Sequence, residues 1–447
     1  MKFRKTLSGA LLAATINFAG GAAMASPAVI TISESGGAPI SHYLYGVNYD
    51  WNEVPEAEFG NFATAISQVA HVTLVRYPGG WNAENYNWMR NTESGKKAPA
   101  SPGVPPATLL GAVPMASFIT PSEKAISNPE KINHFVKLTA QLVAQYGGAV
   151  PVWEIGNEWW LQSGARQSRE KCLQNLQNYA ELLAAVVPAI KAENPSVKVF
   201  ATVDWTQPDD IATLRQLTGP AWSQIDGISV HSYCGTTDPD HLCGDLPAKL
   251  ALVRASAGKQ LLYASEWAVA KQMSGDDYGI KNANYTIAAL QDLAFAGVTY
   301  AAYWPPIKEL PALAFVSADY GTPFATGIAF GWMSQYYEGT ALRASGPLPA
   351  LAARDGISTT VIVASEDTRT QTVQIDLAGT GLTKVISAQV MSSAQPDDPQ
   401  ASRLVNIASL PTAMTTGADG SPCVQFIVNP GTPGRGSEYE IVRVTLG

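Results

Sequence analysis

The run VPVWEIGNE occupies residues 150–158, and it leads from an apolar start to two polar residues, Asn157 and Glu158. Short apolar runs that end in this way are typical of buried strands in a parallel sheet. Two tryptophans follow directly, which extends the stretch to WEIGNEWW at residues 153–160. The stretch therefore predicts a buried strand that carries a carboxylate to its C-terminal end.

Eight apolar runs of this kind lie between residues 43 and 304, and longer segments of helical period separate several of them. In chain order they are LYGVNYD (44–50), HVTLVRYP (71–78), AVPMASFIT (112–120), VPVWEIGNE (150–158), VKVFATVDW (197–205), IDGISVHSY (225–233), QLLYASEW (260–267) and VTYAAYWPP (298–306). Eight βα units over about 260 residues match the size of a closed (β/α)8 barrel. An open doubly wound sheet is the alternative, but the phosphate-binding motifs GxGxxG and GxxxxGKS are absent from the sequence. We expect an α/β protein whose TIM barrel spans residues 40–340.

The sequence changes character after about residue 345, where strand-like runs are punctuated by Gly, Pro, Asp and Ser. These runs are STTVIVAS (358–365), QTVQIDLAG (371–379), VISAQVM (385–391), CVQFIVNP (423–430) and YEIVRVTLG (439–447). They predict a small antiparallel β-sandwich. The strand-like segment AVITIS (28–33) has no place in an eight-stranded barrel, so we expect it to join the sandwich. The accessory domain would then comprise residues 26–39 and 341–447.

Residues 1–25 have the layout of a secretory signal peptide. A basic start with Lys2, Arg4 and Lys5 leads through an apolar stretch to small residues that end at Ala25. We expect cleavage near Ala25 and a secreted or periplasmic protein, with no later stretch long enough to cross a membrane. The formal charge of -8, without clusters of Lys and Arg, argues against nucleic acid or an anionic membrane as partner.

The four cysteines are compatible with an oxidising compartment. Cys234 and Cys243 bracket the polar loop CGTTDPDHLC and could close it as a disulfide. For Cys172 and Cys423, which lie far apart in the sequence, a bridge and two inert buried thiols are both compatible with the sequence. We expect no zinc site, because no CxxC or HExxH spacing occurs.

Polar and aromatic residues gather at the ends of the predicted strands, where the pocket of a (β/α)8 barrel is built. They are Arg76 after the second strand, Asn157 and Glu158 after the fourth, His231 and Tyr233 after the sixth, Glu266 and Trp267 after the seventh, and Tyr303 and Trp304 after the eighth. Glu158 and Glu266 supply the two carboxylates that cleavage of a glycosidic bond requires. Arg76 could keep one of them ionised for attack, while the other donates a proton.

Each of these residues also has a purely structural explanation. Arg76 alone could neutralise a buried acid, and His231 alone could be a satisfied strand-end histidine. Trp153 suits core packing. Glu154 shares strand parity with Glu158 and lies deeper in the barrel, which favours a supporting role in hydrogen bonding. Packing alone does not explain why so many such groups coincide at successive strand ends.

In this order the motifs resemble those of glycoside hydrolase clan A, the retaining (β/α)8 glycosidases. The resemblance implies that Glu158 is the acid/base and Glu266 the nucleophile. It covers the whole barrel and extends to Arg76, His231, Tyr233 and Trp304.

Within the clan, VRYPGGWNAENYNW (75–88) resembles the corresponding segment of family 51 α-L-arabinofuranosidases. Where that family usually has Asp-Glu-Trp-Asn, this chain has Ser-Glu-Trp-Ala at residues 265–268. A C-terminal sandwich that also takes an N-terminal strand is similar to the arrangement in families 51, 39, 30 and 79. Family 39 β-xylosidases and family 79 β-glucuronidases share much of this frame, so an arabinofuranosidase, a β-xylosidase, a β-glucuronidase and an endo-glycanase all stay open.

We expect a retaining hydrolase of neutral poly- or oligosaccharides that needs neither a metal nor an organic cofactor. The two carboxyl groups should then lie about 5–5.5 Å apart. The expected substrate-binding residues are Asn157, Arg76, His231, Tyr233, Trp304, Trp81 and Trp159. Five tryptophans that follow strands suggest subsites along a cleft, namely Trp51, Trp81, Trp88, Trp159 and Trp205. A carbohydrate-binding protein without catalysis and a scaffold protein built on the sandwich are the alternative classes.

Overall fold

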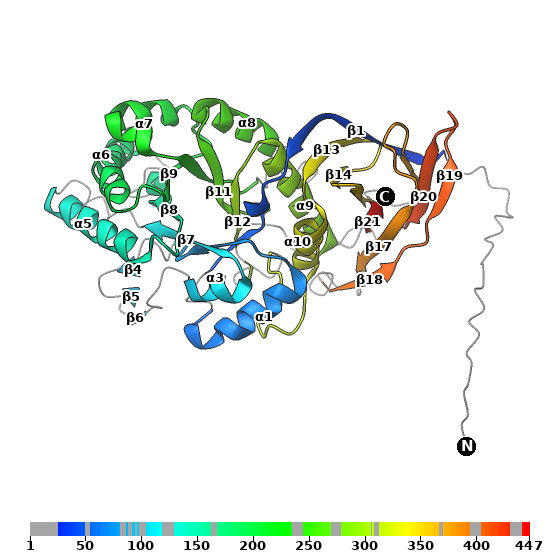
Figure 1. The fold of residues 1–447 in the computed structure, drawn as a ribbon, viewed down its shortest axis with the longest axis horizontal. Coiled ribbons are helices and arrows are strands. Elements are labelled where there is room, and N and C mark those ends of the chain that lie inside the picture. The colour runs from blue at the N-terminus through cyan, green and yellow to red at the C-terminus, as the bar shows by residue number, and fades with distance from the viewer. Residues whose placement is uncertain are drawn as a thin grey trace, which may run out of the picture.

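A barrel and a β-sandwich lie side by side in the computed structural model (Figure 1). The structure describes residues 26–49, 54–80, 86–87, 92–93, 96–97, 104–118, 129–161, 168–234, 245–269, 279–304, 306–307, 313–365, 370–393, 404–429 and 440–447. The expected signal peptide at residues 1–25 lies outside them. Among the described helices, none combines the length and apolarity needed to cross a bilayer.

Eight parallel strands in the described part of the chain close into a barrel. They are β2 (Gly46–Asn48), β3 (Leu74–Tyr77), β7 (Val113–Phe118), β8 (Val152–Ile155), β9 (Lys198–Val203), β10 (Gly227–His231), β11 (Leu261–Trp267) and β12 (Tyr300–Tyr303). Each expected run contains one of these strands, and β12 pairs with β2 to complete the ring. The predicted (β/α)8 barrel is therefore confirmed.

Helices follow the strands and cover the outside of the barrel (Figure 1). They are α1 (Phe59–Val69), α3 (Val104–Leu110), α5 (Pro129–Tyr146), α6 (Arg169–Glu193), α7 (Asp210–Thr218), α8 (Leu246–Ala257), α9 (Ile280–Phe295) and α10 (Ala325–Tyr336). Shorter elements are the 3-10 helices η1 (His42–Leu44), η2 (Glu56–Glu58) and η4 (Gly219–Gln224), and the strands β4 (Tyr86–Asn87), β5 (Thr92–Glu93) and β6 (Lys96–Lys97). In α6, Ser168 caps the N-terminus, and a buried stripe that includes Leu176, Leu183 and Val187 packs into the barrel core.

The interior of the barrel is filled by side chains and is not a pore. Leu74, Val152, Phe200, Tyr263 and Ala302 come from five different strands and form one buried cluster. Residues that point inward from a barrel strand recur at every second position. This cluster is therefore an apolar floor, and the next inward residues along each strand lie above it.

The second lobe is built from a ten-stranded sheet in the described chain, with the order β18-β17-β21-β15-β14-β13-β1-β16-β20-β19. Its strands are β1 (Ala28–Pro39), β13 (Thr340–Ser345), β14 (Ala350–Asp355), β15 (Ser358–Ala364), β16 (Gln371–Asp376), β17 (Val385–Ser393), β18 (Val405–Ser409), β19 (Ala413–Thr416), β20 (Pro422–Val428) and β21 (Ile441–Leu446). Ile30 of β1, Val361 of β15 and Phe426 of β20 share one core cluster. Because these strands are not neighbours in the sheet, the sheet folds over to enclose that core as a sandwich.

The N-terminal strand β1 lies in the sandwich, between β13 and β16. It runs antiparallel to β13 but parallel to β16, so this pair departs from the antiparallel pairing of the other described strands in the sandwich. The reason is that β1 is inserted between strands that the chain forms much later, and no hairpin sets its direction. The opposite face of the sheet packs on the barrel, where Leu351 of β14 and Ile362 of β15 share a core cluster with Ile287 of α9.

Candidate active site

A layer of polar side chains lies directly above the apolar floor of the barrel. Two positions beyond floor residues Leu74, Val152 and Phe200, the same strands carry Arg76, Glu154 and Thr202. All three polar residues are buried. The period of two along a strand therefore replaces an apolar layer with a charged one at the level where the catalytic pocket of such a barrel begins.

Arg76 is the centre of this layer. Its Nε lies 2.6 Å from Oε2 of Glu154, and its Nη1 lies 2.9 Å from Oε1 of Glu266. Nη1 also donates to Oδ1 of Asn48 at 2.9 Å, and Nη2 donates to Oδ1 of Asn157 at 3.1 Å. Burial alone would lower the pKa of Arg76, but Glu154 and Glu266 raise it above its ordinary value. The guanidinium is therefore a permanent positive charge that joins four strands.

The structure thus places Arg76 behind the carboxylates. The sequence predicts that Arg76 binds substrate, whereas in the structure its side chain is fully buried and holds Glu266. Glu154 has the supporting role that strand parity predicts, because it accepts from Arg76 at the bottom of the pocket.

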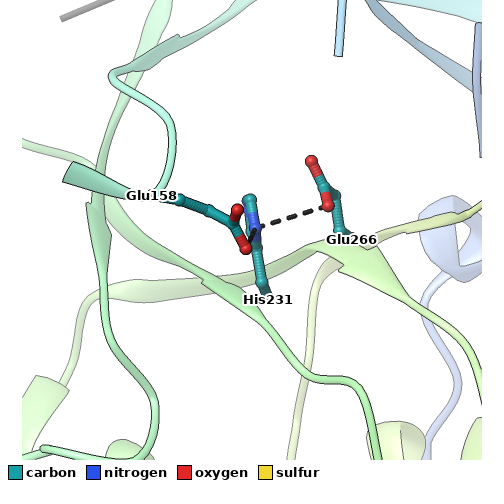
Figure 2. Close-up of side chains that lie close together, drawn as sticks. All are labelled: Glu158, His231 and Glu266. Atoms are coloured by element: carbon teal, nitrogen blue, oxygen red, sulfur yellow. Dashed lines mark hydrogen bonds and ion pairs between the residues drawn. The ribbon is translucent and has the colours of Figure 1, made fainter. Parts of the chain in front are cut away.

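Glu158, His231 and Glu266 converge from β8, β10 and β11 (Figure 2). Nδ1 of His231 lies 3.1 Å from Oε1 of Glu158 and 3.4 Å from Oε2 of Glu266. One ligand-type atom from each of the three residues lies within 4.8 Å of the others. The distance between the carboxyl groups of Glu158 and Glu266 is therefore far shorter than the roughly 6.5–9.5 Å of inverting glycosidases, and it is compatible with the separation of about 5–5.5 Å in retaining ones.

The two carboxylates occupy different environments. The side chain of Glu266 is only 3% exposed, and it accepts from Arg76 on Oε1 and from the hydroxyl of Tyr233 on Oε2, at 2.9 and 2.7 Å. Burial, followed by the charge of Glu266, raises the pKa of Tyr233 well above its usual range, so this hydroxyl keeps its proton. Glu158 is 28% exposed and can exchange protons with the cleft. The two donors fix the orientation of the Glu266 carboxylate, whereas the Glu158 carboxylate is open to the cleft.

His231 lies between the carboxylates as a buried ring. Burial lowers its pKa, but Glu266 and Glu158 raise it by more, so the net direction is upward. Because Nδ1 faces both carboxylates, only a ring with hydrogen on Nδ1 makes an attractive contact there. Within the described chain, Nε2 of His231 has no hydrogen-bond partner.

The backbone at Glu158 is strained. Its φ of 36° lies in the left-handed region, which costs a residue with a Cβ roughly 1–2 kcal/mol. Two hydrogen bonds of the next residue, Trp159, hold this turn: its indole donates to the carbonyl of Thr202 at 2.8 Å, and its carbonyl accepts from Asn175 at 3.1 Å. The chain therefore turns sharply at the end of β8, and the carboxylate projects into the cleft.

This turn also decides which tryptophan reaches the cleft. Trp159 is buried and stacks on Tyr179 with ring centroids 5.3 Å apart, so the expectation that it binds substrate is wrong. Trp160, two positions beyond Glu158, lines the cleft in its place. Trp205 also lines the cleft. Trp51, Trp81 and Trp88 lie outside the described residues.

Trp304 lies at the end of β12 against two glycines. Gly79 and Gly80 follow β3 with φ values of 60° and 56°. A Cβ on Gly80 would approach Cη2 of Trp304 to 2.8 Å, and one on Gly79 would approach Oδ1 of Asn48 to the same distance. The Pro-Gly-Gly turn of the sequence therefore serves to bring backbone against Trp304 and Asn48.

Several residues of the site were missed from the sequence. Asn48 ends β2, donates from Nδ2 to the carbonyls of Ser265 and Ala302 at 3.0 Å, and accepts from Arg76. The strand-end rule would have found Asn48 had it been applied to the first run. Lys249 on α8 and Arg169 on α6 also line the cleft, but they belong to helices, where that rule gives no signal.

The cleft has a volume of about 560 Å³ and lies over the ends of β8, β9 and β10. Glu158, His231 and Tyr233 border it on the side that faces Glu266. Cys172 also lines it, and both Cys172 and Cys423 are free buried thiols, which settles the choice between a bridge and two thiols. Cys234 is disulfide-bonded, while its expected partner at position 243 lies outside the described residues.

Glu158, His231 and Glu266 are also the residues whose atom types and spacing could hold a divalent cation. The positive charge of Arg76 already lies against Glu266, and Tyr233 occupies its other oxygen. The electrostatics therefore suit a carboxylate held for nucleophilic attack better than a metal ligand.

Comparison with solved structures gives matches over almost the whole chain. A family 51 α-L-arabinofuranosidase from Bifidobacterium longum matches with a TM-score of 0.69 and 17% identity, covering 95% of this chain and 100% of that one. A family 51 α-L-arabinofuranosidase from Thermotoga petrophila matches with a TM-score of 0.68 and 17% identity over 94% and 100% of the two chains. The chain shares their fold.

A monomeric β-xylosidase from Caulobacter crescentus also matches, with a TM-score of 0.61 and 15% identity over 94% of this chain and 99% of that one. No protein-family model matches the sequence, and no curated protein matches it either. The neighbours in structure are glycoside hydrolases, as the resemblance of the motifs had implied, and the architecture of barrel plus sandwich is confirmed.

Proposed function

We propose that the protein is a secreted glycoside hydrolase that cleaves O-glycosidic bonds by double displacement with retention of configuration. The observation that carries the proposal is the pair Glu158 and Glu266, which approach within 4.8 Å and lie in unequal environments. If both carboxylates had the same surroundings, nothing would distinguish the nucleophile from the acid/base. Here the residue with two donors is the nucleophile, and the more exposed residue is the acid/base.

In the first step a carboxylate oxygen of Glu266 attacks the anomeric carbon, while Glu158 transfers its proton to the departing glycosidic oxygen. The sugar is then esterified to Glu266. In the second step the ionised Glu158 takes a proton from water, and the water oxygen displaces Glu266 from the anomeric carbon. The reaction uses only carboxylates of the protein, so it should proceed in the presence of EDTA.

The surrounding residues orient the pair. Arg76 and Tyr233 fix both oxygens of Glu266, which limits the orientations from which it can attack. His231 contacts both carboxylates and keeps Glu158 directed at the reaction centre. Asn157 and Trp304 lie next to this centre, and we assign them to the hydroxyls and the ring face of the bound sugar.

The proposed substrate is a neutral poly- or oligosaccharide, with α-L-arabinofuranosides first and β-xylosides, β-glucuronides and internal glycan bonds as alternatives. Arg76, the strand-end cation beside the carboxylates, is committed to Glu154 and Glu266, which disfavours a uronic acid at the reaction centre. The solved neighbours include arabinofuranosidases and a xylosidase.

Export is part of the proposal. The layout of residues 1–25 and the disulfide at Cys234 both suit an oxidising compartment outside the cytoplasm. The mass of the protein recovered from the periplasm or medium should correspond to a chain that begins at Ser26. Recovery of a full-length chain would contradict this part.

The activity is tested with 4-nitrophenyl α-L-arabinofuranoside, β-D-xyloside, β-D-glucuronide and β-D-glucoside, and with arabinan, arabinoxylan, xylan and xyloglucan. Glu266→Gln and Glu158→Gln should each lose at least about a thousandfold in kcat on the natural glycan. Glu181→Gln, on an exposed position of α6, is the matched control and should keep full activity. Binding of a glycan without release of any product would instead identify a carbohydrate-binding protein.

A further inference from the structure

The cleft described above is asymmetric about the two carboxylates. Glu158 lines it together with His231 and Tyr233, whereas Glu266 and Trp304 do not. It extends from Glu158 over the end of β9 and lies between α6 and α8. We propose that this cleft is the leaving-group subsite and that it takes a second sugar ring, with Trp205 and Lys249 as its recognition pair. This inference rests on the proposed function.

The position of Glu158 decides which part of the substrate occupies the cleft. The nucleophile must face the anomeric carbon, and the acid must face the oxygen of the departing group. The departing group therefore lies on the side of Glu158. Because Glu158 forms the border between the reaction centre and the cleft, the group that leaves enters the cleft.

The cleft has the chemistry of a site for a sugar ring. Its volume of about 560 Å³ is far larger than a methyl or other small leaving group needs. Trp160 and Trp205 form apolar parts of the wall, and Asp204, Gln207 and Lys249 supply polar groups. A sugar ring presents C–H groups on its faces and hydroxyls around its edge, so it can contact both kinds of wall at once.

Trp205 and Lys249 act as one unit. Nζ of Lys249 lies 4.9 Å from the ring centroid of Trp205, which is a cation–π contact. Lys249 also pairs with Asp245, which lies four positions earlier and directly precedes α8. The ammonium group has three donors, and the side chain is partly exposed, so donors are left for the hydroxyls of a sugar.

Arg169 borders the other end of the cleft. Nη1 of Arg169 donates to Oδ2 of the buried Asp210 at 2.8 Å, and its Nη2 contacts the second oxygen. The side chain is half exposed although its head group is fixed. The cleft is therefore lined by groups whose positions are set before a ligand binds, as recognition of an extended substrate requires.

The test compares two leaving groups on the same sugar. After the nitrophenyl panel has identified that sugar, the probes are its disaccharide, for example 1,5-α-L-arabinobiose or β-1,4-xylobiose, and its glycosyl fluoride. Fluoride is too small to fill the cleft, so the ratio of kcat/KM for disaccharide over fluoride measures the contribution of the cleft. Trp205→Ala and Lys249→Met should each lower this ratio roughly tenfold.

Trp222→Ala is the matched control. Trp222 lies in η4, outside the cleft, and carries its own cation–π partner, Arg215, at 5.7 Å. Its removal should leave the ratio unchanged. Trp205→Phe keeps an aromatic ring and should lower the ratio less than Trp205→Ala, which covers the case that the alanine variant fails to fold.

The outcomes separate the two proposals. The subsite proposal is overturned if the ratio of kcat/KM stays at the wild-type value in Trp205→Phe and Lys249→Met. It is also overturned if kcat/KM falls equally for the disaccharide and the fluoride, because an equal fall indicates general disturbance of the fold. In both cases glycoside hydrolysis itself still stands. If the wild-type protein cleaves neither probe nor any glycoside of the panel, the proposed function fails first.

Discussion

Arg76 and Glu266 form a buried ion pair that joins β3 to β11, with Nη1 2.9 Å from Oε1. The same guanidinium neutralises Glu154 at 2.6 Å. One cation therefore compensates two buried carboxylates, and one of these is the proposed nucleophile. The stability of the barrel and the geometry of the reaction centre depend on the same side chain.

Arg76→Met should destabilise the protein strongly, because it leaves Glu154 and Glu266 buried without a cation. We expect the free energy of unfolding to fall by about 3–5 kcal/mol. Urea unfolding followed by tryptophan fluorescence measures this loss. Arg354→Met is the control, since Arg354 and Glu34 form a pair with side chains 25% and 59% exposed, and its loss should stay below about 1 kcal/mol. Equal losses in both variants would contradict the account.

Gly80→Ala should reduce activity through Trp304. The added Cβ would lie 2.8 Å from Cη2 of Trp304, so the indole must move. Because we assign Trp304 to the ring face of the bound sugar, its displacement should lower kcat/KM roughly tenfold or more. Gly356→Ala is the matched control, because Gly356 has almost the same φ, 55°, but nothing within 4 Å of the added carbon. Both variants place an alanine in the left-handed region and carry similar backbone strain, but only Gly80→Ala should lose activity.

His231→Asn should change how stability depends on pH. The pKa of His231 is raised above its usual 6.5, because Glu266 and Glu158 outweigh burial. Its proton therefore stabilises the folded state fully below pH 6.5, and this stabilisation is lost as pH rises through the folded pKa. The wild-type free energy of unfolding should thus fall above pH 6.5 more steeply than that of His231→Asn. His134→Asn, at an exposed position, is the control and should follow the wild-type curve. Parallel curves of unfolding free energy against pH for the wild type and His231→Asn would refute this role of His231.

Asp292→Asn should remove a different pH dependence, at the contact of barrel and sandwich. Burial raises the pKa of Asp292 from 3.8 to about 7, although Arg343 opposes the shift. The residue lines a cavity of about 150 Å³ between α9 and the strands β14 and β15. A carboxyl whose pKa is raised on folding loses stability as pH rises from the unfolded to the folded value, here between about 4 and 7.

The Asp292→Asn variant should therefore match the wild type at pH 4 and exceed it by about 2–4 kcal/mol at pH 8. Thermal or urea unfolding at a series of pH values measures the difference. Asp355→Asn, on the exposed end of β14, is the control and should show no such gain. A variant that is less stable than the wild type at pH 8 would show that the charge of Asp292 is needed for contact with Arg343.

The barrel was predictable because its signals are local and repeated. Each parallel strand is buried on both sides and therefore reads as a continuous apolar run, as VPVWEIGNE does. The edge strands β18 and β19 were missed because most of their residues are exposed and carry no apolar alternation. The direction of β1 was not predictable, since its partners β13 and β16 lie more than 300 residues away in the sequence.

The approach of Glu158 to Glu266 was predictable because barrel topology brings strand ends together regardless of sequence distance. Trp159 was assigned because it follows a strand directly, but its indole packs on Tyr179, and Trp160 lines the cleft. Lys249 was not found for another reason: its neighbour Trp205 follows a strand, but Lys249 itself comes from a helix that only the fold brings near.

The stereochemistry of the product tests the central claim most directly. Proton NMR can record the anomeric signal of the first sugar released from the panel substrate, before mutarotation mixes the two anomers. Because Glu158 and Glu266 approach within 4.8 Å, the account predicts that the first product has the same anomeric configuration as the substrate. A first product of the opposite configuration would show a single displacement by water and would contradict the assignment of Glu266 as nucleophile.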